Sequence, residues 1–242
     1  MIRSGSILVG VLFAGLGLTA AARAADIEPS LRLPAASGKT VAVTLDACSG
    51  RTDMRIVDEL IADGIPATLF VTHRWIVRNA EAIALFKAHP DLFEIENHGD
   101  QHVPAVTDTP TLFGLTTAGS LPAVNSEVTG GEAAIGAAFG LRPTWFRGAG
   151  ARYSKDAAAL IGQLGYRIAG YSLNGDIGAS LPEAAVAKRL AAAKAGDVII
   201  AHVNQPDRPA GAGVVAGLKA LKAAGFTFVR LDAAFPATAA QN

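Results

Sequence analysis

The sequence lacks the excess of basic residues that binds nucleic acid, and it has too little cysteine for a disulfide. Charged residues make up 17% of its 242 residues, and 21 basic side chains balance 21 acidic ones. Without a basic excess or a basic run, the chain lacks the means to hold nucleic acid through its phosphates. The single cysteine excludes a disulfide within the chain. A hydrophobic content of 50% excludes an intrinsically disordered protein. Stability must therefore come from a packed core, which a chain of this length can build.

The N-terminus has the pattern of an export signal. Arg3 precedes an apolar run from Ile7 to Leu18, and Ala22-Arg23-Ala24 has small residues at the positions that a signal peptidase reads. We therefore expect residues 1–24 to be a signal peptide and the mature protein to be exported, either periplasmic or secreted. The run is short for a bilayer span, and charged residues or glycine interrupt every later one, so no stable membrane span is expected after cleavage.

After a polar leader over residues 25–39, apolar runs of strand type alternate with helical patterns. We expect strands over residues 41–45, 67–72, 93–97, 144–147, 166–173, 198–203 and 226–231, and helices over 51–64, 80–88 and 157–164, with a last helix around Leu218. Repeated strand–helix units indicate one α/β domain over residues 40–235 with a parallel sheet, either open or closed into a barrel. A tail over residues 236–242 follows.

Local signals mark where some of these helices begin and end. Gly64 is predicted to end the first helix in a left-handed conformation. Ser154 is predicted to cap a helix that Gly165 closes, and Ser180-Leu181-Pro182-Glu183 has the form of a capping box. Residues 103–127 are rich in Thr, Pro, Gly and Ser and predict a long loop that is either functional or mobile. As a functional loop, it is expected to decide specificity.

In a parallel α/β domain, ligands bind at the carboxyl ends of the strands. The polar residues that end apolar runs there are Asp46 with nearby Cys48, the pair His98 and His102, Arg147, Asp176 and His202. The two histidines are four positions apart, so they lie on the same side and can ligate a divalent metal. This spacing alone also fits surface or core histidines. His73 and His89 do not end strands in this way, and we expect them to be structural or solvent-facing.

Taken together, these residues resemble the motifs of the polysaccharide deacetylase family, the NodB homology domain of carbohydrate esterase family 4, over about residues 40–231. The segment Thr44-Leu45-Asp46-Ala47-Cys48-Ser49-Gly50 is similar to the family's Thr-Phe-Asp-Asp-Gly, and Asn97-His98-Gly99-Asp100-Gln101-His102 is similar to its Asn-His-(Ser/Thr)-x-x-His. The third, fourth and fifth motifs match around Arg147, around Asp176 and at Ile200-Ala201-His202, in family order. The resemblance implies a distorted (β/α) barrel.

The resemblance also implies a metal and a base. His98 and His102 would hold a divalent metal, with zinc expected, that polarises the acetamide carbonyl and activates a water. Asp46 would be the general base for this water, and Arg147 would orient Asp46. A carboxylate tethered to a guanidinium group stays ionised, so this division of roles is chemically sound.

By the same resemblance, His202 would be the general acid that protonates the leaving amine, held in that state by Asp176. A histidine beside a carboxylate has its pKa raised toward the working pH. Tyr153 is expected to line the pocket as a substrate-binding residue, and its backbone or that of a neighbour would donate to the developing oxyanion.

The first and fourth motifs depart from the family. Ala47 stands where the family has the second aspartate that supplies a third metal ligand. Three outcomes are open: the histidines bind metal with Asp46 or a water, Cys48 replaces the oxygen ligand, or the site binds metal weakly. A lone cysteine at a strand end is more often a small buried hydrophobe. In the fourth motif, Ile177 stands where the family often has an aromatic residue.

The leading expectation is a metal-dependent hydrolase that removes acetyl groups from N-acetylated or O-acetylated sugars of an envelope polysaccharide, peptidoglycan included. Its partner would be an acetylated polysaccharide or oligosaccharide. Three alternatives stay open. They are an amidase or cyclic-amide hydrolase acting on a small molecule, a glycan-binding protein that has lost the metal and its activity, and a nucleophilic hydrolase that uses Cys48.

Overall fold

The structure is a computed structural model that describes residues 27–34 and 38–236. The predicted signal peptide over residues 1–24 and the tail beyond residue 236 lie outside the described residues. Within the described ranges, no helix combines the length and the apolar character that crossing a membrane requires.

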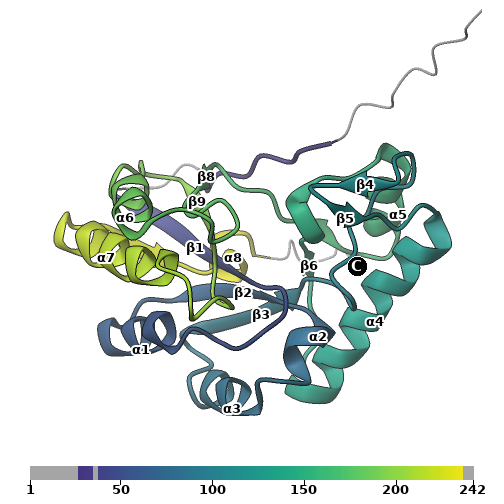
Figure 1. Ribbon diagram of the computed structural model, residues 1–242. Coiled ribbons are helices and arrows are strands. Elements are labelled where there is room, and N and C mark those ends of the chain that lie inside the picture. Colours follow the sequence, from purple (N-terminus) through teal and green to yellow (C-terminus); the bar gives the residue numbers. More distant parts are fainter. Residues whose placement is uncertain (1–26, 35–37, 237–242) are drawn as a thin grey trace, which may run out of the picture.

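A curled parallel sheet forms the centre of the fold (Figure 1). The strands follow one another across it in the order β7 (Arg167–Ile168), β6 (Trp145–Phe146), β3 (Phe93–Asn97), β2 (Ala67–Val71), β1 (Thr40–Ala47), β9 (Val198–His202) and β8 (Leu173–Asn174). A further strand, β10 (Thr227–Val229), pairs in parallel with the beginning of β1. This curled sheet is the distorted (β/α) barrel that the sequence predicts.

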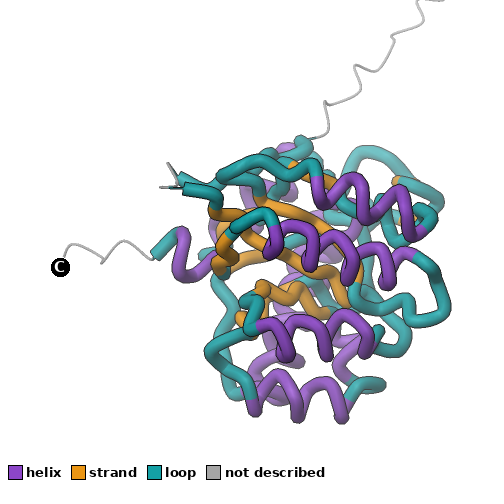
Figure 2. The backbone as a smooth tube through the Cα atoms, turned by 90° about the vertical axis from the view of Figure 1, so that its left-hand side faces the viewer, coloured by secondary structure: helices purple, strands orange, loops and turns teal. Residues whose placement is uncertain are grey.

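Helices cover the outside of the sheet, and several of them stack side by side over the strands (Figure 2). They are α1 (Met54–Asp63), α2 (His73–Ile76), α3 (Ala80–Ala88), α4 (Leu121–Phe139), α5 (Lys155–Gln163), α6 (Glu183–Ala191), α7 (Ala210–Ala223) and α8 (Leu231–Ala234). The most extensive packing between helices joins α6 and α7, and α7 buries Val214, Leu218 and Leu221 there. The apolar layer between helices and sheet is the main core.

The strand β1 shows how the sheet separates the core from the site. Its odd-numbered residues from Val41 to Ala47 are buried in the apolar cluster shared with the helices. Its even-numbered residues face the inside of the curl, where Ala42 packs in a smaller apolar cluster and Thr44 and Asp46 contact Arg147. Because side chains alternate along a strand, one face of β1 stabilises the fold and the other leads into the site.

Helix ends follow the predicted signals in part. Asp53 caps α1 by accepting a hydrogen bond from the N–H of Arg55, and Gly64 ends this helix with φ of 62° in the left-handed region, as predicted. Ser154 precedes α5, but its hydroxyl contacts Thr107 instead of capping the helix.

The predicted capping box at Ser180–Glu183 is wrong. Pro182 takes the N-cap position of α6, and the hydroxyl of Ser180 donates to the carbonyl of Ile177 instead. A proline before the first helical residue already sets an extended entry to the helix, so the serine lies too far from the first turn to cap it.

The region predicted as one strand over residues 166–173 forms two short strands, β7 and β8, at opposite edges of the sheet. Between them, the carbonyls of Ala169 and Gly170 accept hydrogen bonds from the guanidinium of Arg147, at 3.3 and 3.1 Å. Both carbonyls are thereby satisfied although neither residue belongs to a strand. The sheet curls without pairing its two edges.

The N-terminal segment over residues 27–34, here called the strap, crosses the space between these edges; it is drawn purple in Figure 1. Ile27 pairs with Tyr153, and Arg32 pairs with Asp197 through both the backbone and an ion pair of 2.5 Å. A Cβ at Gly170 would lie 2.1 Å from the carbonyl oxygen of Pro29, so the strap lies directly against the chain there. Residues 27–34 of the predicted leader thus pack against the domain.

The predicted loop over residues 103–127 is wrong in part, because it holds a hairpin and the start of a helix. The hairpin pairs β4 (Thr111–Leu112) with β5 (Leu115–Thr116), and α4 begins at Leu121 behind the capping residue Ser120. Pro122 resembles a break in the sequence but is tolerated in the first turn of a helix.

Helix α4 approaches the end of β3 very closely. A Cβ at Gly131 would lie 2.2 Å from the side-chain oxygen of Asn97 and 2.8 Å from the carbonyl carbon of Gly99. Asn97 ties the two elements together, because its amide nitrogen donates to the carbonyl of Val128 and its oxygen accepts from the N–H of Gly99. The contact needs a residue without a side chain at position 131.

We predict opposite effects of alanine at two glycines of α4. Gly131→Ala should destabilise the protein by about 1–3 kcal/mol, because the new methyl group overlaps backbone that cannot move freely. Gly136→Ala is the control: its nearest neighbour would be 3.8 Å away, and the better helix former should stabilise by about 0.5–1 kcal/mol. Urea unfolding midpoints measure both changes. Equal stabilisation by the two substitutions would contradict the close approach.

Candidate active site

The residues predicted at the strand ends converge on one pocket of about 380 Å³. Asp46, His98, His102 and His202 line it directly, while Arg147 and Asp176 lie buried behind them. A second, more open cavity of about 470 Å³ lies beside the starts of α1 and α3, and neither histidine nor cysteine lines it. The three histidines predicted for the site therefore line the pocket of about 380 Å³ and not this second cavity.

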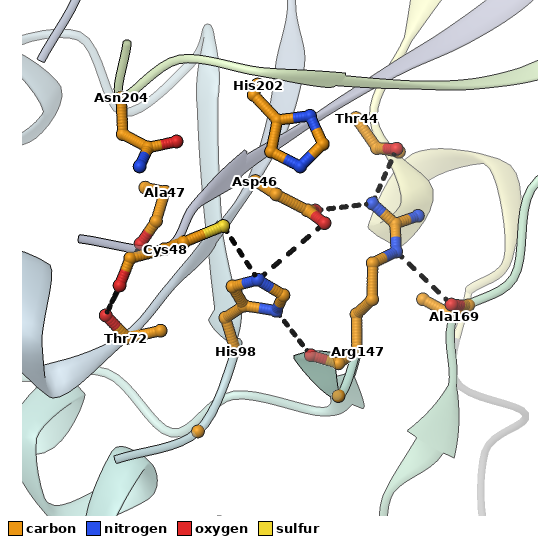
Figure 3. A network of polar contacts seen from close by, with 12 residues as sticks. Thr44, Asp46, Ala47, Cys48, Thr72, His98, Arg147, Ala169, His202 and Asn204 are labelled. Carbon is orange, nitrogen blue, oxygen red and sulfur yellow. Dashed lines mark hydrogen bonds and ion pairs between the residues drawn. The ribbon is translucent and has the colours of Figure 1, made fainter. Parts of the chain in front are cut away.

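Arg147 and Asp46 form an ion pair inside the curled sheet (Figure 3). Arg147 has no exposed surface; one of its nitrogens donates to Asp46 Oδ1 at 2.8 Å and to Thr44 Oγ1 at 2.9 Å, and its guanidinium carbon lies 4.2 Å from the ring centre of Phe70. Burial alone would raise the pKa of Asp46, but the charge of Arg147, helped by His98 and His202, lowers it below its ordinary value. Asp46 is thus held as an ion.

His98 lies between Asp46 and Cys48, fully buried at the end of β3 (Figure 3). Its Nδ1 donates to the carbonyl of Arg147 at 2.5 Å, which leaves Nε2 directed at the pocket. Nε2 lies 3.5 Å from Cys48 Sγ and 3.7 Å from Asp46 Oδ2. Burial opposes a charge on His98, yet the nearby Asp46 and Cys48 raise its pKa above the ordinary value.

Cys48, His98 and His102 form a cluster whose ligand atoms all lie within 4.8 Å of one another. Burial would raise the pKa of the Cys48 thiol, but His98 and hydrogen bonds from the surrounding histidines hold it well below its usual range. Two imidazole nitrogens and a sulfur are ligands that zinc and similar divalent ions bind well. The residues present therefore fit a metal ion.

His202 and Asp176 form a second ion pair, in which His202 of β9 lies opposite Asp46 of the neighbouring strand β1. The imidazole Nδ1 lies 2.9 Å from Asp176 Oδ1, and the backbone N–H of His202 donates to Asp176 Oδ2 at 2.7 Å. Burial would lower the pKa of His202, but the hydrogen bond to fully buried Asp176 and contact with Cys48 raise it well above the ordinary value. His202 is therefore poised to carry a proton near neutral pH.

The loop that carries His102 is held in place by Glu127 of α4, which the sequence did not single out. His102 has a φ of 62°, a left-handed backbone conformation that residues other than glycine rarely adopt. The Glu127 carboxylate accepts hydrogen bonds from the N–H groups of both of its neighbours, Gln101 and Val103. Because this carboxylate grips both sides of a strained residue, it sets the position of the His102 ring. No sequence signal pointed to Glu127, since it lay in a predicted loop.

Tyr153 lies elsewhere than predicted. Its side chain is fully buried, with the hydroxyl accepting from the N–H of Gly148 at 2.8 Å, and its own N–H donates to the carbonyl of Ile27 in the strap. It therefore neither lines the pocket nor has a free backbone donor for an oxyanion. Gly150 and Ala151 line the pocket at this point.

The outer rim of the pocket is largely apolar. Phe113 and Leu115 come from the β4–β5 hairpin, within the region predicted to decide specificity, and Ile177 comes from the fourth motif. Glu28 of the strap adds a carboxylate that accepts from the Tyr171 hydroxyl at 3.3 Å. Neither Glu28 nor Tyr171 was predicted, because their pairing depends on residues far apart in the sequence.

Comparison with known proteins places this geometry in context. The family model described as polysaccharide deacetylase matches residues 34–169 of this chain. No curated protein matches the sequence.

Among solved structures, a peptidoglycan N-acetylglucosamine deacetylase has a TM-score of 0.68 at 17% identity, covering 85% of this chain and 92% of its own. A family 4 acetyl xylan esterase from Clostridium thermocellum, with a cobalt ion, has a TM-score of 0.64 at 22% identity, covering 81% and 90%. A family 4 pseudoenzyme from Bacillus anthracis has a TM-score of 0.63 at 17% identity and 81% coverage, and this chain spans 64% of that longer chain. At these identities, the comparisons establish the fold.

The contacts of Glu127 predict how the loop responds to substitution. Glu127→Ala should speed amide hydrogen exchange at Gln101 and Val103 by about ten-fold or more, because a hydrogen bond to a charged group is worth about 1.5–3 kcal/mol. Glu127→Gln is the intermediate control: its amide oxygen can accept from both N–H groups as Oε1 does, but it lacks the second oxygen that also accepts from Gln101, so exchange should rise less than in the alanine variant. Unchanged exchange in the alanine variant would show that Glu127 does not hold this loop.

Proposed function

Because this chain belongs to the polysaccharide deacetylase family, we propose that it is a metal-dependent hydrolase that removes acetyl groups from N-acetylated or O-acetylated sugars of an envelope polysaccharide. The observation that carries the proposal is that one pocket brings His98 and His102 of a possible metal cluster together with two ion pairs, Arg147–Asp46 and His202–Asp176. The signal-peptide pattern of residues 1–24 supports export to the periplasm or the exterior, where such polysaccharides are found.

His98 and His102 would hold the metal in this proposal. When bound, a divalent ion there supplies polarisation of the acetyl carbonyl and a lower pKa for a water molecule. The cobalt ion in the C. thermocellum esterase supports the use of a metal by this fold. Zinc is the proposed ion here, because imidazole is among its preferred ligands.

Asp46 would act as the general base. Its Oδ1 is occupied by Arg147, whereas Oδ2 lies on the side of His98 and the pocket. The lowered pKa keeps the carboxylate ionised, so Oδ2 is ready to take the proton of the attacking water. Arg147 acts through Asp46 by fixing its orientation.

His202 would protonate the departing amine of an N-acetylated sugar, or the departing hydroxyl of an O-acetylated one. Asp176 holds Nδ1 of the ring, which leaves Nε2 as the nitrogen free to donate a proton. The raised pKa keeps His202 protonated at neutral pH while Asp46 is ionised. Acid and base are thus available in the same state of the enzyme.

Two other functions would use the same pocket. The apolar rim formed by Phe113 and Ile177 favours an amide-bearing small molecule as the alternative substrate. Ala47, together with the pseudoenzyme among the similar structures, favours a glycan-binding protein without activity. Acetate release from acetylated chito-oligosaccharides, xylan and peptidoglycan fragments supports the deacetylase. Binding of these glycans without acetate release would support the inactive protein.

The metal dependence is tested with one ligand, one base and one distant histidine. His98→Ala should lose both bound metal and activity, while Asp46→Asn should keep the metal and lose about 10²–10⁴-fold in kcat, as expected for a general base. His89→Ala, at the end of α3 and outside the pocket, should change neither. Metal analysis before and after chelation, with acetate assays, measures these effects. Full activity in metal-free protein would refute the mechanism, and loss of metal from Asp46→Asn would make Asp46 a ligand.

The pH dependence tests the role of Asp176. In kcat/KM profiles the alkaline limb reports loss of the proton from His202, whose pKa is raised partly by its bond to Asp176. Asp176→Asn should move this limb to lower pH, because the proton on His202 loses its charged partner. The acidic limb, set by Asp46, should stay in place. An unmoved alkaline limb would remove His202 from the role of general acid.

A further inference from the structure

We propose that Cys48 supplies the third protein ligand of the metal, so that a sulfur stands in for the missing carboxylate and the site selects thiophilic ions such as zinc and cadmium over magnesium and manganese. This rests on the proposed function only in assuming that the pocket binds a metal.

The alternation of side chains along β1 explains why position 48 and not position 47 reaches the two histidines. Ala47 has the same orientation as Leu45 and is fully buried in the apolar cluster against the helices. An aspartate at position 47 of this strand would face that apolar cluster. Cys48 follows Thr44 and Asp46 in the inward series, and its sulfur lies against His98 (Figure 3).

The backbone around Cys48 is fixed by Thr72 at the end of β2. The Thr72 hydroxyl donates to the carbonyl of Cys48 at 2.5 Å, and its N–H donates to the carbonyl of Ala47 at 3.3 Å. These two bonds anchor the turn that leaves β1. The sulfur is therefore held toward the histidines by the fold itself.

The spacing of the ligand atoms suits one ion. Zinc bonds of about 2.3 Å to sulfur and about 2.0 Å to nitrogen, at a tetrahedral angle, separate the two ligand atoms by about 3.5 Å. Cys48 Sγ and His98 Nε2 lie 3.5 Å apart, and His102 completes a set within 4.8 Å. This set contains no oxygen of Asp46, whose Oδ1 is bound to Arg147. Cysteine as ligand therefore leaves the aspartate free for proton transfer.

The ligand chemistry favours the same assignment. One thiolate with two neutral imidazoles carries the same single negative charge as one carboxylate with two imidazoles, so the metal's net charge is balanced equally. Sulfur is the softer donor, and soft donors select zinc-like ions over magnesium and manganese. Cys48 does not have the surroundings of a buried apolar residue. Its side chain is half-buried, and it belongs to none of the three apolar clusters that the described residues form.

The test is spectroscopic and needs no substrate. Because the chain has one cysteine, sulfur-to-cobalt charge-transfer absorption in the near ultraviolet has Cys48 as its only thiolate source. Purified wild-type protein loaded with one equivalent of Co²⁺ should show this band. Cys48→Asp, which restores a carboxylate, should still bind Co²⁺ but lack the band. His89→Ala should keep the band.

The same variants test metal selectivity by competition between Cd²⁺ and Mn²⁺. Loss of even an outer partner of a metal ligand costs about 10–100-fold in affinity, so Cys48→Asp should lower the preference for Cd²⁺ over Mn²⁺ by at least about ten-fold. Circular dichroism shows whether Cys48→Asp is folded. If it is not, Cys48→Ser, the closest variant in size, takes its place and should show the same loss of the band. An unchanged ion preference in a folded variant would overturn the proposal.

The outcomes separate this proposal from the one on which it rests. Wild-type protein that binds Co²⁺ without the near-ultraviolet band overturns ligation by Cys48 and leaves a metal-dependent deacetylase standing. Wild-type protein that binds no Co²⁺ overturns both. Acetate release by cobalt-loaded Cys48→Asp supports a ligand role, because a sulfur nucleophile could not be replaced in this way.

Discussion

The buried guanidinium of Arg147 is the constraint on which the rest of the structure depends. A charge without exposed surface must have its N–H groups satisfied, because an unpaired buried charge costs several kcal/mol. Arg147 meets this requirement with Asp46 and Thr44 from β1 and with the carbonyls of Ala169 and Gly170. Those carbonyls belong to the chain between β7 and β8, so one side chain both keeps Asp46 ionised and binds the segment that links the two edges of the sheet.

The two ion pairs of the pocket shift neighbouring pKa values in opposite directions. Arg147 keeps Asp46 ionised, and Asp176 keeps His202 protonated, although burial alone opposes both charges. In the proposed reaction a base and an acid are needed at once, and a single protein supplies them by giving each a buried partner of opposite sign. His202 and Asp46 lie opposite each other on the neighbouring strands β9 and β1, and the cluster of Cys48, His98 and His102 lies beside them.

The sequence predicted the elements whose signals are local. The strand Phe93–Asn97, the helix Ala80–Ala88 and the end of α1 at Gly64 all follow from apolar runs and a glycine within a few residues. Residues 166–173 were predicted as one strand from their apolar residues. In the structure, the carbonyls of Ala169 and Gly170 in this stretch accept hydrogen bonds from Arg147.

The site divides in the same way. The motifs located Asp46 and the histidines by position, and the pocket brings them together. Tyr153 was misplaced because its N–H pairs with Ile27, and Glu127 was missed because its value lies in contacts 24 to 26 positions earlier in the chain. Such contacts leave no periodicity or spacing for a single sequence to show.

The strap gives the molecule an order of assembly. Arg32 finds Asp197 only across 165 positions, so a chain made from its N-terminus exposes the strap long before its docking place exists. The pairing of β1 with β10 joins Thr40 and Thr227 across 187 positions and has to wait for the end of the chain in the same way. Glu28, which walls the pocket, arrives with the strap. A partly synthesised chain therefore cannot present a finished pocket, because the pocket needs both Glu28 from the strap and His202 from far along the chain.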